Sequence, residues 1–550
     1  MSDNGRLYLG IDFGNTTVGV AAIYPPVDGE DQSTVRYHVI DRWRVTHTRE
    51  MGRSRLPTRL AYSEEGFHLR SRLWGYAILP AAPANSWFKL PLDEGIMSRV
   101  RDGRFIEDKW TESVGIFRQS EGRSYKEMAS TFLSYLDEEI RIFLRRAKLH
   151  NLPKTLTFTY PATWSDESVV TLREAIHAAG FGTDEGDQVV MGPEPLAVVS
   201  ALMKPDSGEI KIKATDAVIV CDCGGSTIDI TSYDIVTSDL RPPTQLTAHT
   251  EPLLGSTCID RAFYELVSTR LIPNFDKLGL RETSPTSMMM RDFEEVKRKF
   301  DENSAAYRHA FREVIKFRQE YACRVYLLQS QLRDLFQPVV TRICNLLSEQ
   351  IDEANRVAGK DIINKIILIG GFAGSPYLES AIRQRFETNE MTVYRPDRPE
   401  NIIAASAALW AKEYDEATPH PTYHYGVEFG QGPDNTVTDD IAWFRKKHER
   451  FDQPNTRKAI RVKCTLNTKV HGTAVYFFRT RICPAPEKAK EGVELIGAMT
   501  LDLTTLINAG TPAEGDDVVF RFLVNVGLQE IDVAAFIDDY HVGRQRIPMA

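Results

Sequence analysis

The chain has 550 residues, of which 42% are hydrophobic and 26% charged, and its formal net charge is −9. This length allows two or more domains with substantial cores, and the composition is that of an ordinary soluble globular protein. The negative charge and the lack of a Lys/Arg block argue against a general nucleic-acid-binding surface. No apolar segment is long enough to span a bilayer, and the polar start argues against a signal peptide. Seven scattered cysteines suggest reduced thiols, so we expect a cytoplasmic protein. From the charge and the lack of a long apolar segment, we expect it to contact neither nucleic acid nor membrane.

The first pattern is a strand, a polar turn and a second strand. The apolar run Leu7–Asp12 leads into Phe13-Gly14-Asn15-Thr16-Thr17, and Val18–Tyr24 follows as another strand. The stretch Val218–Ile230 has the same form, with Asp222 at the bend and Gly224, Gly225, Ser226 and Thr227 in the turn. Glycines in such a turn let an anion approach the backbone amides closely, although Gly-Gly-Ser also makes ordinary hairpins.

The two turns match residue by residue. Both read D-x-G-x-[T/S]-T-[V/I]-x-[V/I], so that Asp12 corresponds to Asp222 and Thr17 to Thr227. The copies lie too far apart for a solenoid repeat. We therefore expect two related lobes, each with a phosphate-binding hairpin.

Residues 25–124 show a mixture of short strands and loops. Within them, Lys89 stands among apolar neighbours, and the residues alone favour a surface lysine whose aliphatic stem is buried.

Helices and strands alternate from residue 124 to residue 411, which indicates an α/β architecture. The predicted helices are Ser124–Asn151, Asp166–Ala179, Leu196–Met203, Cys258–Leu271, one within Pro285–Asn303, Gln331–Ala358 and Tyr377–Phe386. The predicted strands are Leu156–Tyr160, Val189–Met191 and Lys365–Ile369. Ser165 and Gly180 are the expected N-cap and stop signal of the second helix.

Three sites in this region have both a structural and a functional interpretation. Glu194 precedes the helix that begins near Pro195, where it serves as a cap or positions a water, with the two readings about even. Glu294, Lys297 and Arg298 share a helix face, for which an exposed salt-bridged surface is the default explanation. Gly370 and Gly371 follow a strand and precede a helix N-terminus, which is a second kind of anion or nucleotide site.

The character of the sequence changes after residue 413. Residues 414–424 are polar and interrupted by proline, as in a linker, and residues 425–550 alternate like strands. The strands expected there are Tyr425–Phe429, Lys458–Thr465, Thr473–Phe478, Leu495–Asp502, Val518–Val526 and Glu530–Ile537. We therefore expect residues 1–413 to form an α/β domain and residues 425–550 a smaller all-β domain.

These motifs resemble those of the 70-kDa heat-shock protein family, a branch of the actin-like ATPases. The segments that carry the resemblance are Gly10–Thr17, Phe158–Thr163, Gly192–Ala201, Val220–Asp229, Ile366–Pro376 and Arg398–Ala408. The resemblance implies a two-lobed ATPase domain followed by a β-rich domain that is similar to a truncated substrate-binding domain, without a helical lid.

The resemblance also assigns roles to the candidate residues. It implies Mg-ATP and ADP binding, with Asp12 and Asp222 holding Mg²⁺ through water and Lys89, Glu194, Asp222 and Thr227 as catalytic residues. The implied phosphate contacts are Gly14, Asn15, Thr16, Thr17, Gly224, Gly225, Ser226 and Thr227. The implied nucleoside contacts are Glu294, Lys297, Arg298, Gly370, Gly371 and Phe372. The resemblance therefore favours the functional readings of Glu194 and of the Glu294 group.

The sequence departs from the family pattern at several of these positions. Asn15 replaces a threonine, Ser226 replaces a glycine, Phe372 replaces a serine and Ser406 replaces a glycine. The linker also lacks the family's run of leucines. These differences are similar to those of a divergent branch of the family and place ordinary chaperone action in question.

Three functions are compatible with the sequence. The first is slow Mg-dependent ATP hydrolysis coupled to the binding of a peptide or protein client, with co-chaperones as further partners. The second is a nucleotide-gated protein-binding module without significant turnover. The third is a small-molecule kinase of the actin-like superfamily, against which the β-rich tail argues.

Overall fold

A computed structural model gives the arrangement of most of the chain. It describes residues 5–24, 37–41, 43, 54–62, 73–79, 82–102, 107–120, 122–204, 210, 212–213, 215–235, 243–271, 275, 278–304, 312–316, 324–417, 424–431, 436–437, 442–445, 456–465, 472–480, 493–502, 517–526, 530–537 and 540–548. The contacts between residues divide the chain into two compact units, Met1–Lys412 and Glu413–Ala550. Among the described helices, none is long and apolar enough to cross a membrane.

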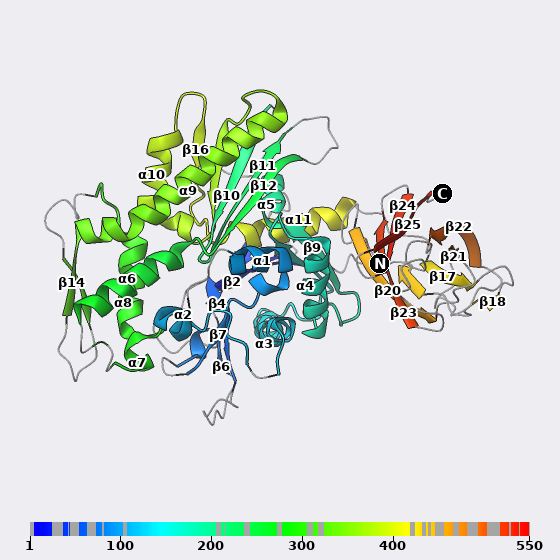
Figure 1. Cartoon of the computed structure of the whole chain (residues 1–550), viewed down its shortest axis with the longest axis horizontal. Helices are drawn as coiled ribbons and strands as arrows, with labels where there is room; N and C mark the ends of the chain where they lie inside the picture. Colours follow the sequence, from blue (N-terminus) through cyan, green and yellow to red (C-terminus); the bar gives the residue numbers. More distant parts are fainter. Residues whose placement is uncertain are drawn as a thin grey trace. The chain divides into compact units, whose positions relative to one another are not determined.

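The first unit is a mixed α/β structure with two principal sheets, consistent with an actin-like ATPase fold (Figure 1). The first sheet has the order β3-β2-β1-β8-β9, with β4 also paired to β2. Its strands are β1 (Leu7–Phe13), β2 (Thr17–Ile23), β3 (Tyr37–Val39), β4 (Arg55–Pro57), β8 (Lys154–Tyr160) and β9 (Gln188–Pro193).

The second sheet repeats the topology of the first. Its order is β12-β11-β10-β15-β16. The strands are β10 (Ala217–Cys223), β11 (Thr227–Asp234), β12 (Thr244–Pro252), β15 (Lys365–Ile369) and β16 (Thr392–Tyr394). In each sheet an antiparallel hairpin, β1–β2 or β10–β11, is followed by parallel strands. The two equivalent hairpins carry the two matched turns of the sequence.

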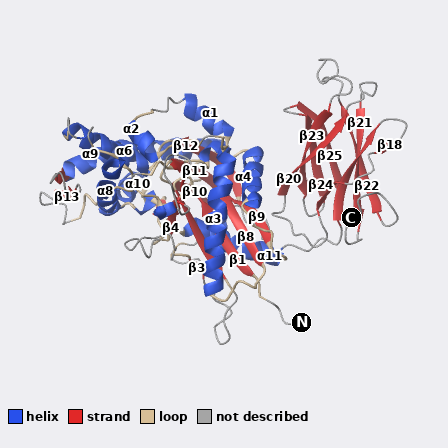
Figure 2. Cartoon of the chain, turned by 90° about the horizontal axis from the view of Figure 1, so that it is seen from below, coloured by secondary structure: helices blue, strands red, loops and turns tan. Residues whose placement is uncertain are grey.

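Alternating residues of each sheet face different helices. Leu9, Ile11 and Phe13 of β1 pack in one core with α3 (Tyr125–Arg146) and α4 (Asp166–Ala178), which cover that face of the sheet (Figure 2). Ile219 and Cys221 of β10 belong to a second core. The helices of that core include α6 (Ser256–Arg270), α8 (Met288–Lys299), α9 (Gln329–Ala358) and α10 (Pro376–Phe386).

Two further helices pack against the other faces of the two sheets. Val198 of α5 (Glu194–Leu202) and Ile403 of α11 (Ile402–Ala417) share a core with Val218 of β10. Helix α11 also approaches the first sheet, because a Cβ on Gly10 would lie 2.0 Å from the carbonyl oxygen of Ala404. Helix α11 therefore contacts both sheets.

The long elements agree with the sequence predictions to within a few residues at their ends. Ser165 caps α4 by accepting a hydrogen bond from Ser168 N, and Gly180 follows the helix with φ +98°. The prediction of only strands and loops for residues 25–124 is wrong, since α1 (Glu94–Asp102) and α2 (Lys109–Val114) lie there. Helix α2 has a recognisable signal in its capping box, Asp108 and Thr111, and in Gly115 at its end.

The shorter elements of this unit complete the list. They are β5 (Arg59–Ala61), β6 (Leu73–Trp74), β7 (Asn85–Ser86), β13 (Arg312–Lys316), β14 (Arg324–Leu328), α7 (Leu280–Thr283) and the 3₁₀ turns Gly75–Ala77, Leu90–Leu92 and Phe372–Gly374.

In the second unit, the elements described after α11 are strands in two sheets. The orders are β18-β17-β21-β22, with β19 paired to β17, and β20-β23-β24-β25. The strands are β17 (His424–Gln431), β18 (Thr436–Val437), β19 (Ala442–Arg445), β20 (Thr456–Thr465), β21 (Gly472–Thr480), β22 (Val493–Asp502), β23 (Asp517–Val526), β24 (Glu530–Ile537) and β25 (Tyr540–Pro548). The predicted linker overlaps the end of α11 and the start of β17, and its residues 418–423 lie outside the described part.

Candidate functional site

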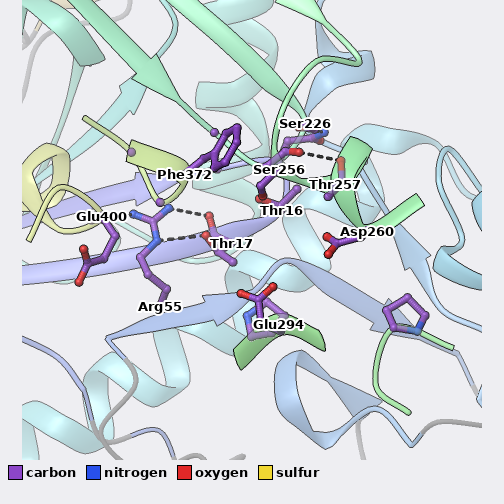
Figure 3. Close-up of a pocket in the computed structure, with 18 of the residues that line it drawn as sticks. Thr16, Thr17, Arg55, Ser226, Ser256, Thr257, Asp260, Glu294, Phe372 and Glu400 are labelled. Carbon is purple, nitrogen blue, oxygen red and sulfur yellow. Dashed lines mark hydrogen bonds between the residues drawn. The ribbon is translucent and has the colours of Figure 1, made fainter. Parts of the chain in front are cut away.

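A cavity of about 1090 Å³ in the first unit brings the candidate residues together (Figure 3). Every residue that the sequence singled out as a catalytic, phosphate, nucleoside or metal contact lines it. These residues come from the β1–β2 turn, the β10–β11 turn, the segment before α1, the start of α5, helix α8 and the turn after β15. Segments that are far apart in the sequence therefore meet at one site.

The two matched turns have the same backbone hydrogen bond. Gly14 N donates to Thr17 O at 3.0 Å, and Gly224 N donates to Thr227 O at 3.1 Å. Their approach is close, because a Cβ on Gly225 would lie 2.5 Å from Thr16 Oγ1. Glycine is therefore required at position 225 for the two turns to touch.

A side-chain hydrogen bond also joins the two turns. Asn15 Nδ2 donates to Ser226 Oγ at 2.9 Å, and both residues are buried. Asn15 Oδ1 accepts from Leu90 N at 3.1 Å, which ties the segment that carries Lys89 to the first turn.

Four carboxylates, Asp12, Glu194, Asp222 and Asp229, line this end of the cavity. Burial raises the pKa of Asp222 well above its usual value, and the charges of Glu194, Asp229 and Asp12 add to that effect. Burial also raises the pKa of Asp229. It raises the pKa of Glu194 to about 7, with the charges of Asp12 and Asp229 adding to the shift and Lys89 opposing it. The cluster favours protons or a cation, because buried carboxylates of like charge disfavour simultaneous ionisation.

Lys89 is not the surface lysine that its neighbours in the sequence suggested. Its side chain is 5% exposed, and its Nζ lies 3.1 Å from Glu194 Oε1 and 5.3 Å from the centre of the Trp164 ring. Burying an ammonium group without a partner is costly, and Glu194 supplies that partner. The carboxylate at the start of α5 therefore pairs with Lys89 in the cavity and also has a favourable place at the helix N-terminus.

Arg55, in β4, is a residue of this site that the sequence reading missed. Its guanidinium group forms an ion pair with Asp12. The group donates to Thr17 Oγ1 at 3.1 Å and to Thr17 O at 3.0 Å (Figure 3). It also donates to Glu400 O at 2.9 Å. Nothing in the residues around Arg55 marks it, since its position depends on the pairing of β4 with β2.

The far end of the cavity carries a second charged group. Glu294 accepts from Arg298 Nε at 2.6 Å and lies 2.7 Å from Lys297 Nζ. Lys297 is buried and also pairs with Asp260 of α6 at 2.7 Å. The default expectation of an exposed face is thus wrong for Lys297 and correct for Arg298, whose side chain is 60% exposed.

The two carboxylates of this group have opposite pKa shifts. Burial raises the pKa of Asp260 to about 6. Burial acts in the same direction on Glu294, but Lys297 and Arg298 outweigh it and lower the pKa to about 2. Glu294 is therefore ionised at neutral pH and can accept hydrogen bonds from a ligand.

The turn after β15 also lines the cavity. Gly370 has φ +89°, and a Cβ there would lie 2.1 Å from Asp222 Oδ1. Gly371 follows, and Phe372 begins the 3₁₀ turn that precedes α10. Ser375 caps α10 by accepting from Leu378 N. The backbone thus passes directly beside Asp222.

The donor set suits a phosphorylated ligand with a hard cation. Backbone amides of two glycine turns, one lysine and one arginine face the same region as four carboxylates. Among the described residues, no three His, Cys, Asp or Glu side chains converge to hold a metal ion directly. Metal binding by Asp12 and Asp222 through water stays a prediction.

Asp229 and Asp260 were also absent from the predicted site. Asp229 lies in β11, two residues past Thr227, and accepts a hydrogen bond from Thr250. The sequence did contain a signal for it, because alternation along β11 places Thr227 and Asp229 on the same face.

Comparisons with known proteins agree with the resemblance in the motifs. The family model described as Hsp70 protein matches residues 107–415, which is more than half of the chain. The chain is 26% identical over 301 residues to the mitochondrial-type heat shock protein 70 of Encephalitozoon hellem, covering 52% of this chain and 45% of that protein. It is 23% identical over 257 residues to the heat shock 70 kDa protein 14 of Bos taurus, covering 46% of this chain and 47% of that protein. The alignments thus span about half the length of each of these relatives.

Proposed function

Because the chain belongs to the Hsp70 protein family, we propose that it binds Mg-ATP in the cavity of its first unit and hydrolyses it slowly to ADP and phosphate. One observation carries the proposal. The candidate residues belong to separate sequence motifs, and all of them line a single cavity with phosphate-type turns at one end. Such convergence is what a nucleotide site requires, since the phosphates and the nucleoside need different chemistry.

The phosphate end would hold the polyphosphate chain on the amides of the two turns. Asp12 and Asp222 would hold Mg²⁺ through water, and bound Mg²⁺ would supply positive charge beside the phosphate oxygens. Arg55 keeps Asp12 paired, and Lys89 presents an ammonium group at the same end of the cavity. These cations would stabilise negative charge that develops on a transferred phosphoryl group.

Glu194 would position the attacking water. With a pKa of about 7 in the ligand-free cavity, its carboxylate is poised between the protonated and ionised states near neutral pH. Its bond with Lys89 holds one carboxylate oxygen in place. Thr227 would add a hydroxyl donor beside the second turn.

The opposite end would bind the nucleoside. Ionised Glu294 can accept from ribose hydroxyls, and Arg298 can lie against the flat face of a base. The turn formed by Gly370, Gly371 and Phe372 would border the nucleoside on the other side.

Single-turnover hydrolysis of radiolabelled ATP by the purified chain tests the proposal. We expect tight binding of Mg-ATP and slow release of labelled phosphate, with both lost in Asp222→Lys, because a lysine there removes a carboxylate from the centre of the cradle. Absence of ATP binding by the unsubstituted chain would refute the proposed site. Binding without any phosphate release would instead support a nucleotide-gated module without significant turnover.

Two further parts of the proposed function are supported only by membership of the Hsp70 protein family. We propose that the second unit binds a peptide or protein client and that co-chaperones act on the first unit. A cytoplasmic location also stays a prediction.

A further inference from the structure

A side-chain hydrogen bond joins the turns of the two sheets where both line the cavity. Asn15 lies between β1 and β2, and Ser226 lies between β10 and β11. The bond from Asn15 Nδ2 to Ser226 Oγ is 2.9 Å long, and the two residues are 8% and 2% exposed. These are also the two turn positions at which the sequence departs from the family pattern, so the departures are partners in space.

Asn15 is fixed from both sides. Its Oδ1 accepts from Leu90 N at 3.1 Å, while its Nδ2 donates to Ser226. The amide group is therefore oriented by the segment next to Lys89 and is presented to the second turn. An oriented donor loses less conformational freedom when its bond forms than a mobile one does.

The two turns also touch through a second contact beside this hydrogen bond. Thr16 packs directly on Gly225, where a Cβ would lie 2.5 Å from Thr16 Oγ1 and 2.8 Å from Thr16 Cγ2. Thr257 Oγ1 donates to Gly225 O at 2.7 Å, which holds the second turn from behind. The two turns are therefore in contact, and a group that enters between them has to separate them.

We propose that Asn15 and Ser226 form a latch that makes the cavity favour nucleoside diphosphates over triphosphates. The inference rests on the proposed function, since it requires a nucleotide on these turns. Each turn can hold part of a polyphosphate chain on its own amides. The additional phosphoryl group of a triphosphate has to open the bond between Asn15 and Ser226, whereas a diphosphate leaves it intact. Loss of one buried hydrogen bond changes an equilibrium constant by roughly fivefold.

Calorimetric titration of the full chain tests the latch, with ADP and the β,γ-imido analogue of ATP as probes and Mg²⁺ present. Ser226→Ala and Asn15→Ala should each raise the affinity for the analogue relative to ADP by roughly fivefold. The double variant should show no more than the effect of either single variant, because both substitutions remove the same bond.

Ser232→Ala is the matched control. Ser232 is buried in β11 and pairs with Thr247 Oγ1 at 2.7 Å, outside the cavity. The control should leave the ratio of the two affinities unchanged even if it lowers the melting temperature. If Asn15→Ala does not fold, because it also removes the acceptor of Leu90 N, Ser226→Ala decides the question alone.

The possible results distinguish a failure of the latch proposal from a failure of the proposed nucleotide site. If the unsubstituted chain binds both probes and the ratio is unchanged in Ser226→Ala, the latch is refuted and the nucleotide site stands. A fall in analogue affinity would also refute the latch, because the side chains would then be donors to the terminal phosphate. If the unsubstituted chain binds neither probe, the proposed function fails and the latch fails with it.

Discussion

Arg55 illustrates, at the scale of single residues, how a buried carboxylate is supplied with a charged partner. Asp12 is 4% exposed and lines the cavity at the same end as Glu194, Asp222 and Asp229. The guanidinium group is planar and always charged, so it suits a buried partner better than an ammonium group does. It also links Asp12 to the second strand and to the backbone before α11. The ion pair therefore joins three segments of the first unit at the candidate site.

Replacing Arg55 by Gln should destabilise the nucleotide-free chain by about 2–4 kcal/mol, because a buried carboxylate loses its partner. Urea denaturation measures the loss. The control is Arg101→Gln, whose pair with Glu94 is exposed on both sides and should cost less than about 0.5 kcal/mol. We expect added Mg²⁺ to restore part of the stability of Arg55→Gln. Equal losses of unfolding free energy in the two variants would mean that the pair between Arg55 and Asp12 is no more stabilising than an exposed one.

The raised pKa of Asp229 predicts a pH dependence with a definite sign. An aspartate whose pKa is higher in the folded than in the unfolded state binds its proton more tightly in the folded state. The stability that this binding gives is lost as the pH rises from the usual aspartate pKa through the raised one. Its contribution therefore makes the ligand-free chain less stable at pH 8 than at pH 5. Asp229→Asn should remove this effect and raise the melting temperature at pH 8 by about 2 °C.

Asp216→Asn is a control of opposite sign. Burial opposes ionisation of Asp216, but Lys365, 2.8 Å away, and other donors outweigh it and lower the pKa. This substitution should therefore lower the melting temperature at pH 8. We further expect Asp229→Asn to abolish the stabilisation by Mg-ATP, which Asp216→Asn should retain. A stabilised Asp229→Asn that still responds to Mg-ATP would exclude Asp229 from the binding site.

At the scale of elements, the turn between β15 and α10 determines how closely the backbone approaches the acidic cluster. Gly370 N donates to Pro399 O at 2.9 Å, and its positive φ turns the chain beside Asp222. The next residue differs in both respects, since Gly371 has φ −66° and a Cβ there would meet nothing within 4 Å. Two adjacent glycines thus have different structural requirements.

Gly370→Ala should lower stability by more than about 2 kcal/mol and abolish nucleotide binding, because the new Cβ adds backbone strain and displaces Asp222. Gly371→Ala should fold normally, and its melting temperature should stay near that of the unsubstituted chain. Differential scanning calorimetry and ADP titration compare the two. Similar behaviour of the two variants would mean that this turn rearranges easily.

The sequence predicted the elements whose signals are local and long. Helix α9 and the two hairpins follow from periodicity and from matched turn residues. Helix α1 has nine residues and α2 has six, so neither carries enough turns to give a clear periodic signal. The contacts of Arg55, Lys89 and Asp260 could not be predicted from the sequence, for a different reason. Each depends on strands or helices that are brought together only by the tertiary fold.

At the scale of the whole molecule, the candidate site belongs to one of the two units. Every candidate residue lies within Met1–Lys412. Strands then make up the described elements that follow α11. The chemistry of nucleotide binding and any recognition by the β strands can therefore be separated experimentally.

Limited proteolysis of the full chain provides that separation. We expect cleavage within residues 414–424, the predicted linker around His420, because this segment is polar and interrupted by proline. The larger fragment should bind Mg-ATP with the affinity of the full chain, since the phosphate and nucleoside ends of the cavity are both built from its residues. Loss of binding in a fragment that remains folded by circular dichroism would show that the second unit contributes to the site.

The same digestion, repeated with Mg-ATP, tests whether the nucleotide acts on the linker. Helix α11 reaches both sheets of the first unit and ends inside the predicted linker, so a change between the sheets has a direct route to this segment. We expect Mg-ATP to slow cleavage around His420 and to leave cleavage unchanged in Asp222→Lys. Equal rates with and without Mg-ATP, in a chain that binds ATP, would mean that the nucleotide state is not transmitted beyond the first unit. In that case coupling between ATP and a client would have no structural basis in this segment.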